Sequence, residues 1–507
     1  MKADSPRSLE RIAFAVLVSL LLAPVIAVAL WRPLLHVFGP AGNAAAIAIS
    51  ALATGAAVIF LLRWLPRRLP SSLDGLIRRH KLLTALYVSL ALLAVVSTTR
   101  LSIFIGDSSR VSQQALPGEK FLETHSCLTA YVHAAMLSRK GVSNLYDERW
   151  WHGSHGLPPR STDADNPYPP FILDYYAYPP PFLLIMTPLA PLEGDFPAQR
   201  ALWFGLNGLL LALGLWIVAR WIDGPGAHRT LLLGPLLFGS LPILATLQVG
   251  NFQIAVVMIS VLAMVAFHKD RPALGGALLA FTILSKISPG LLGIVLVAQR
   301  RWKAVAWTAG FGAVFLALSL LLSGTDPMKS FLTYTLPRLG TGEAFAFMDD
   351  EPFSVVTNMS PFGIPFKLQL LGIDAGDPWV MGRRIARVYT VLLAILAIAA
   401  ARRTGDRRTH AMTWMSLLVL AALQSPFAPG YVLIGLLWAI TLWSNEVRTV
   451  LGGLALVFLW LLIVAVLPGV SLKFYAINSL LQSALAIGVP IWLLLRPTPP
   501  PALPANV

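Results

Sequence analysis

Carboxylates, histidines and aromatic side chains gather in one polar stretch of the sequence, residues 100–180. Three side chains of this stretch, Asp107, Glu123 and His125, are of the types that can act as a general base. Aromatic rings beside carboxylates also suit carbohydrate, because the C–H faces of sugars are apolar while their hydroxyls need hydrogen-bond partners. An aromatic belt at a membrane interface is the simpler explanation for any single ring. The rings of the stretch are those of Tyr146, Trp150, Trp151, His152, His155, Tyr168, Tyr175, Tyr176 and Tyr178.

Isolated cations and amides elsewhere in the chain are candidates for binding an anionic substrate. Lys286 lies between two short apolar segments, where a lone lysine either reaches the membrane interface or binds phosphate. Arg383 and Arg384 open the apolar segment that follows a second polar stretch, and they fit phosphate or anionic lipid. Gln248 and Asn251 lie at a predicted helix junction, where they either hydrogen-bond substrate or join helices.

Several kinds of chemistry have no support in the sequence. The chain lacks the GxxxxGK[ST] loop that cradles nucleotide phosphates, which argues against an ATP-driven pump. No spacing of His, Cys and acidic residues predicts a zinc site, so we expect neither a metal nor another cofactor. The Asp163-x-Asp165 pair is too short a pattern to indicate a metal site. With Cys127 as the single cysteine, no intrachain disulfide can form.

The composition shows which elements must position these residues. Of the 507 residues 56% are hydrophobic and 12% are charged, whereas soluble proteins average about 25% charged residues. A helix needs about 20 apolar residues to cross a bilayer. We therefore predict an all-α integral membrane protein. The predicted spans lie near residues 12–31, 43–63, 82–99, 200–219, 231–248, 252–267, 304–323, 385–400, 411–424, 429–443, 450–467 and 476–495, with two short helices in 273–299.

The distribution of basic residues orients these spans. Arginines and lysines cluster in short loops between apolar segments, near residues 63–81, 300–303 and 402–408, as in cytoplasmic loops. The net charge of +15 therefore indicates membrane orientation rather than nucleic-acid binding. Parity then predicts about 14 crossings, both termini in the cytoplasm, and the stretches 100–180 and 324–384 outside it. The Pro-interrupted segment Pro181–Leu192 is too short to cross, so we expect it to enter the bilayer and return.

Short motifs in a fixed order resemble glycosyltransferase family 87, a group of polyprenyl-phosphate-sugar-dependent, mannosyltransferase-like proteins of the GT-C superfamily. They are YVHAA at Tyr131–Ala135, NLYD at Asn144–Asp147, YPPP at Tyr178–Pro181, LWFGLN at Leu202–Asn207, QVGN at Gln248–Asn251, SKISP at Ser285–Pro289 and RRWK at Arg300–Lys303. The resemblance spans roughly residues 100–310.

The resemblance implies a GT-C-like helical bundle with its active site outside the cytoplasm. It implies an inverting transfer of a sugar, mannose-like by default, from a polyprenyl-phosphate donor to a glycan, lipid or protein acceptor. Lys286, Arg383 and Arg384 would hold the donor phosphate, and Tyr131, Tyr178, Gln248 and Asn251 would contact substrate. The organisation it suggests has five parts: residues 1–81 (an added helix pair and a basic loop), 82–323 (the catalytic module), 324–384 (the second outer loop), 385–495 (C-terminal helices) and 496–507 (a Pro-rich cytoplasmic tail).

The chain departs from the family at one important position. The family's usual acid lies just before the YVHAA helix, and the matching positions hold Ser126 and Cys127, neither of which is a carboxylate base. The resemblance then favours Asp107 as the base of the transfer, because it follows the helix that leads into the loop, where GT-C proteins place their catalytic acid. Glu123 is the second candidate and His125 the third. Two alternatives therefore stay open beside the transferase: a transporter of lipid-linked saccharides, and a non-catalytic component of envelope glycan assembly. The short cytoplasmic loops are typical of a bacterial inner-membrane protein, whose partners would be the lipid-linked donor, the acceptor and membrane lipids.

Overall fold

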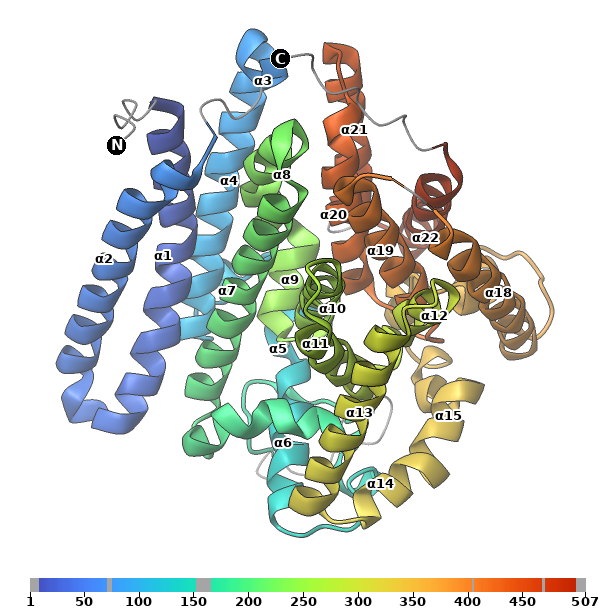
Figure 1. The fold of residues 1–507 in the computed structure, drawn as a ribbon. Coiled ribbons are helices and arrows are strands. Elements are labelled where there is room, and N and C mark those ends of the chain that lie inside the picture. The colour runs from blue at the N-terminus through green and yellow to red at the C-terminus, as the bar shows by residue number, and fades with distance from the viewer. Residues whose placement is uncertain (1–8, 71–74, 152–165, 404, 467–469, 498–507) are drawn as a thin grey trace. The chain divides into compact units, whose positions relative to one another are not determined.

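The computed structural model describes residues 9–70, 75–151, 166–403, 405–466 and 470–497, and these residues are mainly helical (Figure 1). The α-helices are α1 (Leu9–Phe38), α2 (Asn43–Arg68), α3 (Gly75–Arg79), α4 (Lys81–Gly106), α5 (Lys120–Thr124), α6 (Cys127–Arg139), α7 (Phe196–Ile222), α8 (Gly224–Phe238), α9 (Leu241–Val249), α10 (Gln253–His268), α11 (Pro272–Ser285), α12 (Gly290–Ala298), α13 (Trp302–Ser323), α14 (Asp326–Ser330), α15 (Leu336–Thr341), α16 (Pro352–Thr357), α17 (Ile364–Leu370), α18 (Pro378–Ala401), α19 (Arg407–Ala422), α20 (Leu433–Trp443), α21 (Val450–Val464) and α22 (Leu472–Leu495).

These elements form two compact units, each built from separated stretches of the chain. Unit 1 comprises Met1–Thr124, Leu189–Ile254 and Thr441–Val464, and unit 2 comprises His125–Pro188, Ala255–Ile440 and Ala465–Val507. Both units therefore draw residues from several of the five parts predicted from the sequence, whose boundaries stay predictions.

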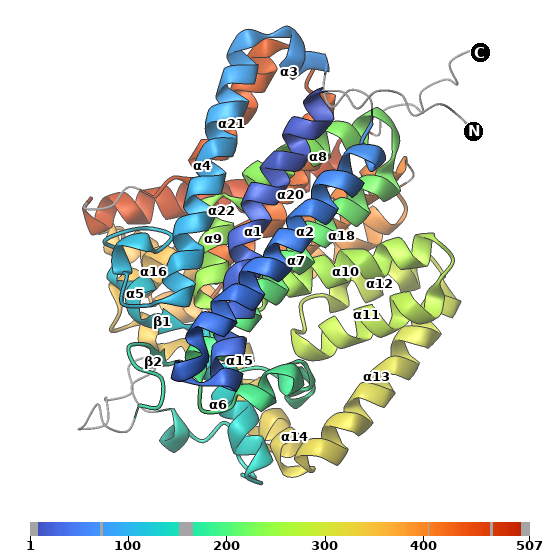
Figure 2. The same ribbon diagram turned by 90° about the vertical axis from the view of Figure 1, so that its left-hand side faces the viewer.

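Unit 1 is a bundle in which small residues let helices approach closely. The helices α1 and α2 run side by side as a hairpin, and α1 also packs against α4 and α7 (Figure 2). A Cβ atom added to Gly205 of α7 would lie 2.2 Å from the Cβ of Ala29 in α1. Such small-residue contacts are common between membrane helices, because packing rather than the hydrophobic effect joins helices in lipid.

In unit 2, the side chains of α19 are buried on nearly every face. The helices α12, α18 and α22 pack against α19. The stretch predicted as the second outer loop is not extended in the structure. It forms the short helices α14–α17 and contains a hydrophobic cluster of its own, made of Phe347, Met348, Val355, Phe362 and Phe366.

The helix lengths confirm the all-α membrane class. Among the described residues, seven helices are long and apolar enough to cross a membrane, or up to eight if the bent pair of α8 and α9 counts as one span. Their apolar side chains are widely exposed, as at Leu52 and Leu321, which are 75% and 81% exposed. Such surfaces need a lipid environment. The count of about 14 crossings stays a prediction.

One predicted span is broken rather than straight. We expected a continuous helix over residues 231–248, but α8 ends at Phe238 and α9 begins at Leu241 with a 55° bend between them. Gly239 caps α8, and Pro242 occupies the first turn of α9 and cannot donate a helical hydrogen bond. Hydropathy alone does not detect such a break. The segment Pro180–Leu192 is a 3₁₀ helix of 13 residues, and its entry into the bilayer stays a prediction.

Candidate functional site

A small parallel sheet in unit 2 brings together side chains that are far apart in the sequence. Strand β1 (His125–Ser126) pairs with strand β2 (Ile172–Leu173), with His125 opposite Ile172. Cys127 follows β1 and Asp174 follows β2, so both lie beyond the same ends of the paired strands. The buried Thr129 hydroxyl lies 3.1 Å from the Ile172 carbonyl oxygen and accepts from the Asp174 amide at 2.9 Å, which fixes the turn after β2.

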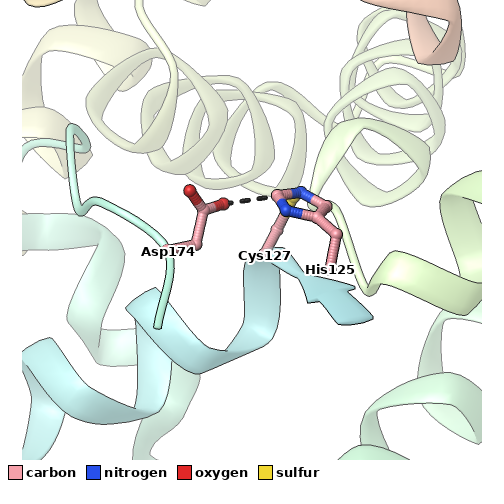
Figure 3. A group of neighbouring side chains, drawn as sticks. All are labelled: His125, Cys127 and Asp174. Atoms are coloured by element: carbon pink, nitrogen blue, oxygen red, sulfur yellow. Dashed lines mark hydrogen bonds and ion pairs between the residues drawn. The ribbon is translucent and has the colours of Figure 1, made fainter. Parts of the chain in front are cut away.

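The side chains of His125, Cys127 and Asp174 converge at this sheet end (Figure 3). The Cys127 Sγ lies 3.5 Å from His125 Nε2, and the same nitrogen lies 3.7 Å from Asp174 Oδ2. The His125 and Asp174 side chains are 18% and 11% exposed, and Cys127 is buried. The cluster is thus a semi-buried group of one thiol, one imidazole and one carboxylate, all three of which can bind a metal.

Lys286, which follows the last residue of α11, lies against two tyrosine rings of unit 2. Its Nζ is 5.7 Å from the ring centroid of Tyr178 and 5.2 Å from that of Tyr431. Both separations are in the range of a cation–π interaction. Burial lowers the pKa of Lys286 to about 8, while the nearby Cys127 acts in the opposite direction. The structure thus holds a cation on an aromatic surface beside the thiol of the cluster.

Two buried tyrosines hold Tyr178 in place. The Tyr131 hydroxyl donates to the Tyr178 hydroxyl at 3.0 Å, and the Tyr146 hydroxyl donates to the Tyr178 carbonyl oxygen at 2.8 Å. Tyr131 is only 1% exposed, so of the two tyrosines predicted to contact substrate, Tyr178 is the more accessible. Tyr131 is suited to position Tyr178 rather than to reach a ligand itself.

The other aromatic residues of the first polar stretch pack into a core. Tyr146, Trp151 and Tyr176 are fully buried, and the Trp151 ring stacks on that of Tyr176 at 6.2 Å. The Trp151 indole N–H donates to the Leu145 carbonyl oxygen at 2.9 Å. These rings support Tyr178 and are not an open sugar platform. His152, His155, Asp163 and Asp165 lie outside the described residues.

Asp107, the first candidate base, follows the last residue of α4 in unit 1. Its carboxylate accepts from the Ser109 hydroxyl at 2.6 Å and from the Arg110 guanidinium at 3.2 Å, and its side chain is 40% exposed. The bond from the Ser109 hydroxyl, followed by the Ser109 amide and Arg110, lowers the pKa of Asp107 below its usual range. Asp107 is therefore an ionised, accessible carboxylate at the end of a predicted span.

Glu123 lies in α5 of unit 1, next to the amide of Gln114, whose nitrogen is 3.3 Å from its carboxylate. Gln248 joins the same region: it accepts from the Ala115 amide at 2.7 Å and donates to the Leu122 carbonyl oxygen at 2.6 Å. Gln248 thus ties α9 to the segment that carries Glu123. Asn251 is also buried and accepts from the Gln253 amide at 3.0 Å, at the start of α10. Contact of these amides with substrate stays a prediction.

Arg383 and Arg384 lie in the N-terminal half of α18 in unit 2. The Gln299 amide at the end of α12 donates to the carbonyl oxygen of Ala401, the last residue of α18. The helix α12 packs beside α18. Its contact with Ala401 lies at the C-terminal end of α18, whereas the two arginines lie near the N-terminal end. Within the described ranges, neither arginine makes a hydrogen bond or ion pair, and none of their contacts joins them to Lys286.

The sequence identified Lys286 and Tyr178 but not how they are assembled. Neither Asp174 nor Tyr431 was singled out from the sequence. A strand of two residues has no periodicity, so nothing in the sequence placed Asp174 beside His125. A weak signal existed at Ser126 and Cys127, which stand at the positions where the resemblance led us to expect an acid.

Residues 176–426, about half of the chain, match the model of glycosyltransferase family 87. The matched range contains Tyr178, Gln248, Asn251, Lys286 and the arginine pair of α18. It begins after Asp107, Glu123, His125 and Tyr131. Comparison with curated proteins and with solved structures gives no match.

Proposed function

Because this chain belongs to glycosyltransferase family 87, we propose that it transfers a sugar from a polyprenyl-phosphate donor to a hydroxyl group of a glycan, lipid or protein acceptor. The sugar is mannose-like by default. The reaction proceeds with inversion at the anomeric carbon and takes place on the outer face of a bacterial inner membrane, with both termini in the cytoplasm.

The observation that carries this proposal is the environment of Lys286. A sugar linked to polyprenyl phosphate carries one negative charge, and a second charge develops on the phosphate as the sugar leaves. An ammonium group in a partly desolvated site stabilises that developing charge more strongly than it would in water. Lys286 lies within the family-matched range, over the rings of Tyr178 and Tyr431. Arg383 and Arg384 are further candidates for the donor phosphate or for anionic lipid.

The proposed chemistry is a single displacement. The acceptor oxygen attacks the anomeric carbon, the bond from that carbon to the phosphate oxygen breaks, and polyprenyl phosphate leaves. The acceptor proton passes to a carboxylate, for which we prefer Asp107 over Glu123 and His125. Asp107 is an accessible carboxylate that is unprotonated at neutral pH, and its lowered pKa makes it a weaker base than an ordinary aspartate.

One observation favours a second candidate function. Ser126 and Cys127 stand where the resembling family has its acid, so the chain is also compatible with a non-catalytic component that binds lipid-linked saccharide without consuming it. Such a component needs the donor site of Lys286 but no base. A transporter of the same ligand would likewise leave the bond between sugar and phosphate intact.

The test is donor consumption by the purified protein in liposomes, with polyprenyl-phosphate-mannose and polyprenyl-phosphate-pentose as donors and a panel of glycan and lipid acceptors. We expect the wild type to release polyprenyl phosphate. The Asp107→Asn variant should be about 10²–10⁴-fold slower, the range that a general base contributes. Glu123→Gln is the matched carboxylate control and should keep most of the rate.

Full activity in Asp107→Asn, with loss in Glu123→Gln, would transfer the role of base to Glu123. If both variants keep full activity, neither carboxylate is the base. If the wild type binds the donor but consumes none, the transferase function is wrong, and a non-catalytic component or a transporter takes its place.

A further inference from the structure

The cluster at the end of the two-stranded sheet has the donor atoms of a transition-metal site. The ligating atoms of His125, Cys127 and Asp174 all lie within 4.8 Å of one another. From this geometry we propose that the three residues bind one divalent transition-metal ion, with zinc as the preferred metal. No spacing in the sequence indicated such a site, because Asp174 reaches it only through the pairing of β1 with β2.

One of the separations, that between sulfur and nitrogen, agrees with tetrahedral coordination as it stands. In a tetrahedral site with Zn–S near 2.3 Å and Zn–N near 2.0 Å, sulfur and nitrogen lie about 3.6 Å apart. The Cys127 Sγ and His125 Nε2 are 3.5 Å apart. The same geometry requires about 3.3 Å between nitrogen and oxygen, whereas His125 Nε2 and Asp174 Oδ2 are 3.7 Å apart. Metal binding therefore requires the Asp174 oxygen to move closer to His125 and Cys127.

The kind of donor atom selects the metal. A thiolate, an imidazole and a carboxylate together suit zinc, whereas magnesium and calcium prefer oxygen ligands alone. Three protein ligands leave a fourth position for water or another oxygen, as in catalytic rather than structural zinc sites. Cys127 is also the first residue of α6, and the N-terminus of a helix favours a thiolate.

Neighbouring groups hold the ligands and balance their charge. The Tyr175 amide donates to Asp174 Oδ1 at 2.9 Å, so the other oxygen, Oδ2, is the one directed towards His125. The Asp174 backbone is fixed by the Thr129 hydroxyl. A dication with one thiolate and one carboxylate has no net charge, so the Lys286 ammonium remains available for an anion. The proposal does not depend on the transferase function, because metal binding is measured without substrates.

The single cysteine makes the test specific. The purified full-length protein in detergent is treated with a chelator, loaded with Zn²⁺ or Co²⁺, and then exposed to a small thiol reagent such as methyl methanethiosulfonate. We expect about one metal ion per chain, a thiolate-to-cobalt charge-transfer band with Co²⁺, and slower modification of Cys127 in the presence of Zn²⁺. The rate should fall by about 10-fold or more, because the free thiolate is the nucleophile and a thiolate bound to the metal is not available to react.

The variants His125→Gln and Asp174→Asn keep the thiol, so modification of Cys127 can still be followed in both. Zn²⁺ should give little or no protection in either variant, and Cys127→Ser should lose the charge-transfer band. Asp374→Asn, which removes an exposed carboxylate outside the cluster, should behave as the wild type. Each variant is first checked for a single monodisperse peak in size-exclusion chromatography.

Two results would overturn the proposal. One is a wild-type protein that binds no Zn²⁺ or Co²⁺ above the level of Cys127→Ser. The other is undiminished protection of Cys127 in Asp174→Asn and His125→Gln, since the metal would then lie elsewhere. If His125→Gln fails to fold, Asp174→Asn decides alone, because its side chain has nearly the same shape as that of aspartate.

Discussion

Lys286 is the residue on which the proposed donor binding depends. Its ammonium lies 5.7 Å and 5.2 Å from two tyrosine ring centroids, and Tyr178 is in turn held by Tyr131 and Tyr146. The buried tyrosines thus act on the donor site indirectly, by fixing the ring that faces the lysine. Lys286 and Tyr178 were recognisable in the sequence, whereas the ring of Tyr431 and the packing of the lysine between the two rings were not.

Replacing Lys286 by Met should raise the KM for the polyprenyl-phosphate donor by about 10- to 100-fold, which corresponds to the loss of one charge-assisted hydrogen bond. The KM for the acceptor should change little. Lys286→Arg keeps the charge, so its KM for the donor should rise much less. Steady-state kinetics with each substrate varied in turn measures both effects. An unchanged donor KM in Lys286→Met would show that the phosphate binds elsewhere, with Arg383 and Arg384 as the next candidates.

The pKa of Lys286 predicts a pH dependence of donor binding. Since this pKa is about 8, the ammonium is present below that pH and is lost above it. The affinity for the anionic donor should therefore fall as the pH rises from about 7 to about 9, although bound phosphate will shift the midpoint upwards. The measurement is donor KM against pH. In Lys286→Arg the decline should disappear, because arginine stays charged over this range. If donor affinity fell with pH in the same way in the wild type and in Lys286→Arg, the titrating group would be a residue other than Lys286.

At the scale of the elements, contacts between helices depend on small residues. Gly205 of α7 faces Ala29 of α1, where an added Cβ would lie 2.2 Å from the alanine Cβ. A Cβ atom cannot move unless the backbone moves with it, so the two helices would have to separate. The same kind of contact joins Gly239 to Ala94 of α4, at the bend between α8 and α9. Sequence periodicity predicted that these helices exist, but not which of their faces meet or where the 55° bend lies.

The Gly205→Ala variant should lower the stability of the protein by about 1–3 kcal/mol, the cost of overpacking a close contact. Gly312→Ala is the matched control, because it lies in α13 with nothing within 4 Å of the added Cβ. That change should be neutral or slightly stabilising, as alanine favours a helix over glycine by about 1 kcal/mol. Thermal unfolding of both variants in the same detergent measures the difference. Equal midpoints for the two would contradict the close packing of α7 on α1.

At the scale of the whole molecule, the membrane class followed from composition, because 12% charged residues cannot cover a soluble protein of this length. The number of crossings could not be derived in the same way. Helices such as α19, α20 and α21 have 16, 11 and 15 residues, fewer than the roughly 20 that cross a bilayer unaided. The cluster of His125, Cys127 and Asp174 could not be predicted from the sequence either, because it depends on the pairing of two strands of two residues each.

The predicted orientation places Asp374 outside the cytoplasm and Lys303 inside it. Both side chains are exposed. In a Cys127→Ser background, Asp374→Cys should react with a membrane-impermeant thiol reagent added to intact cells, while Lys303→Cys should react only after the membrane is opened. If Lys303→Cys reacted in intact cells and Asp374→Cys reacted only after the membrane was opened, the orientation would be inverted. The proposal of a reaction on the outer face would then be wrong.

The most direct test of the proposed function is the fate of the donor itself. The purified protein is reconstituted in liposomes with a polyprenyl-phosphate-sugar that is labelled in the sugar, together with acceptor. We expect polyprenyl phosphate and glycosylated acceptor to appear in equal amounts, with the anomeric configuration of the sugar inverted. Intact donor that crosses the bilayer without release of polyprenyl phosphate, or wild-type protein that consumes no donor, would contradict the assignment of this chain as an active transferase.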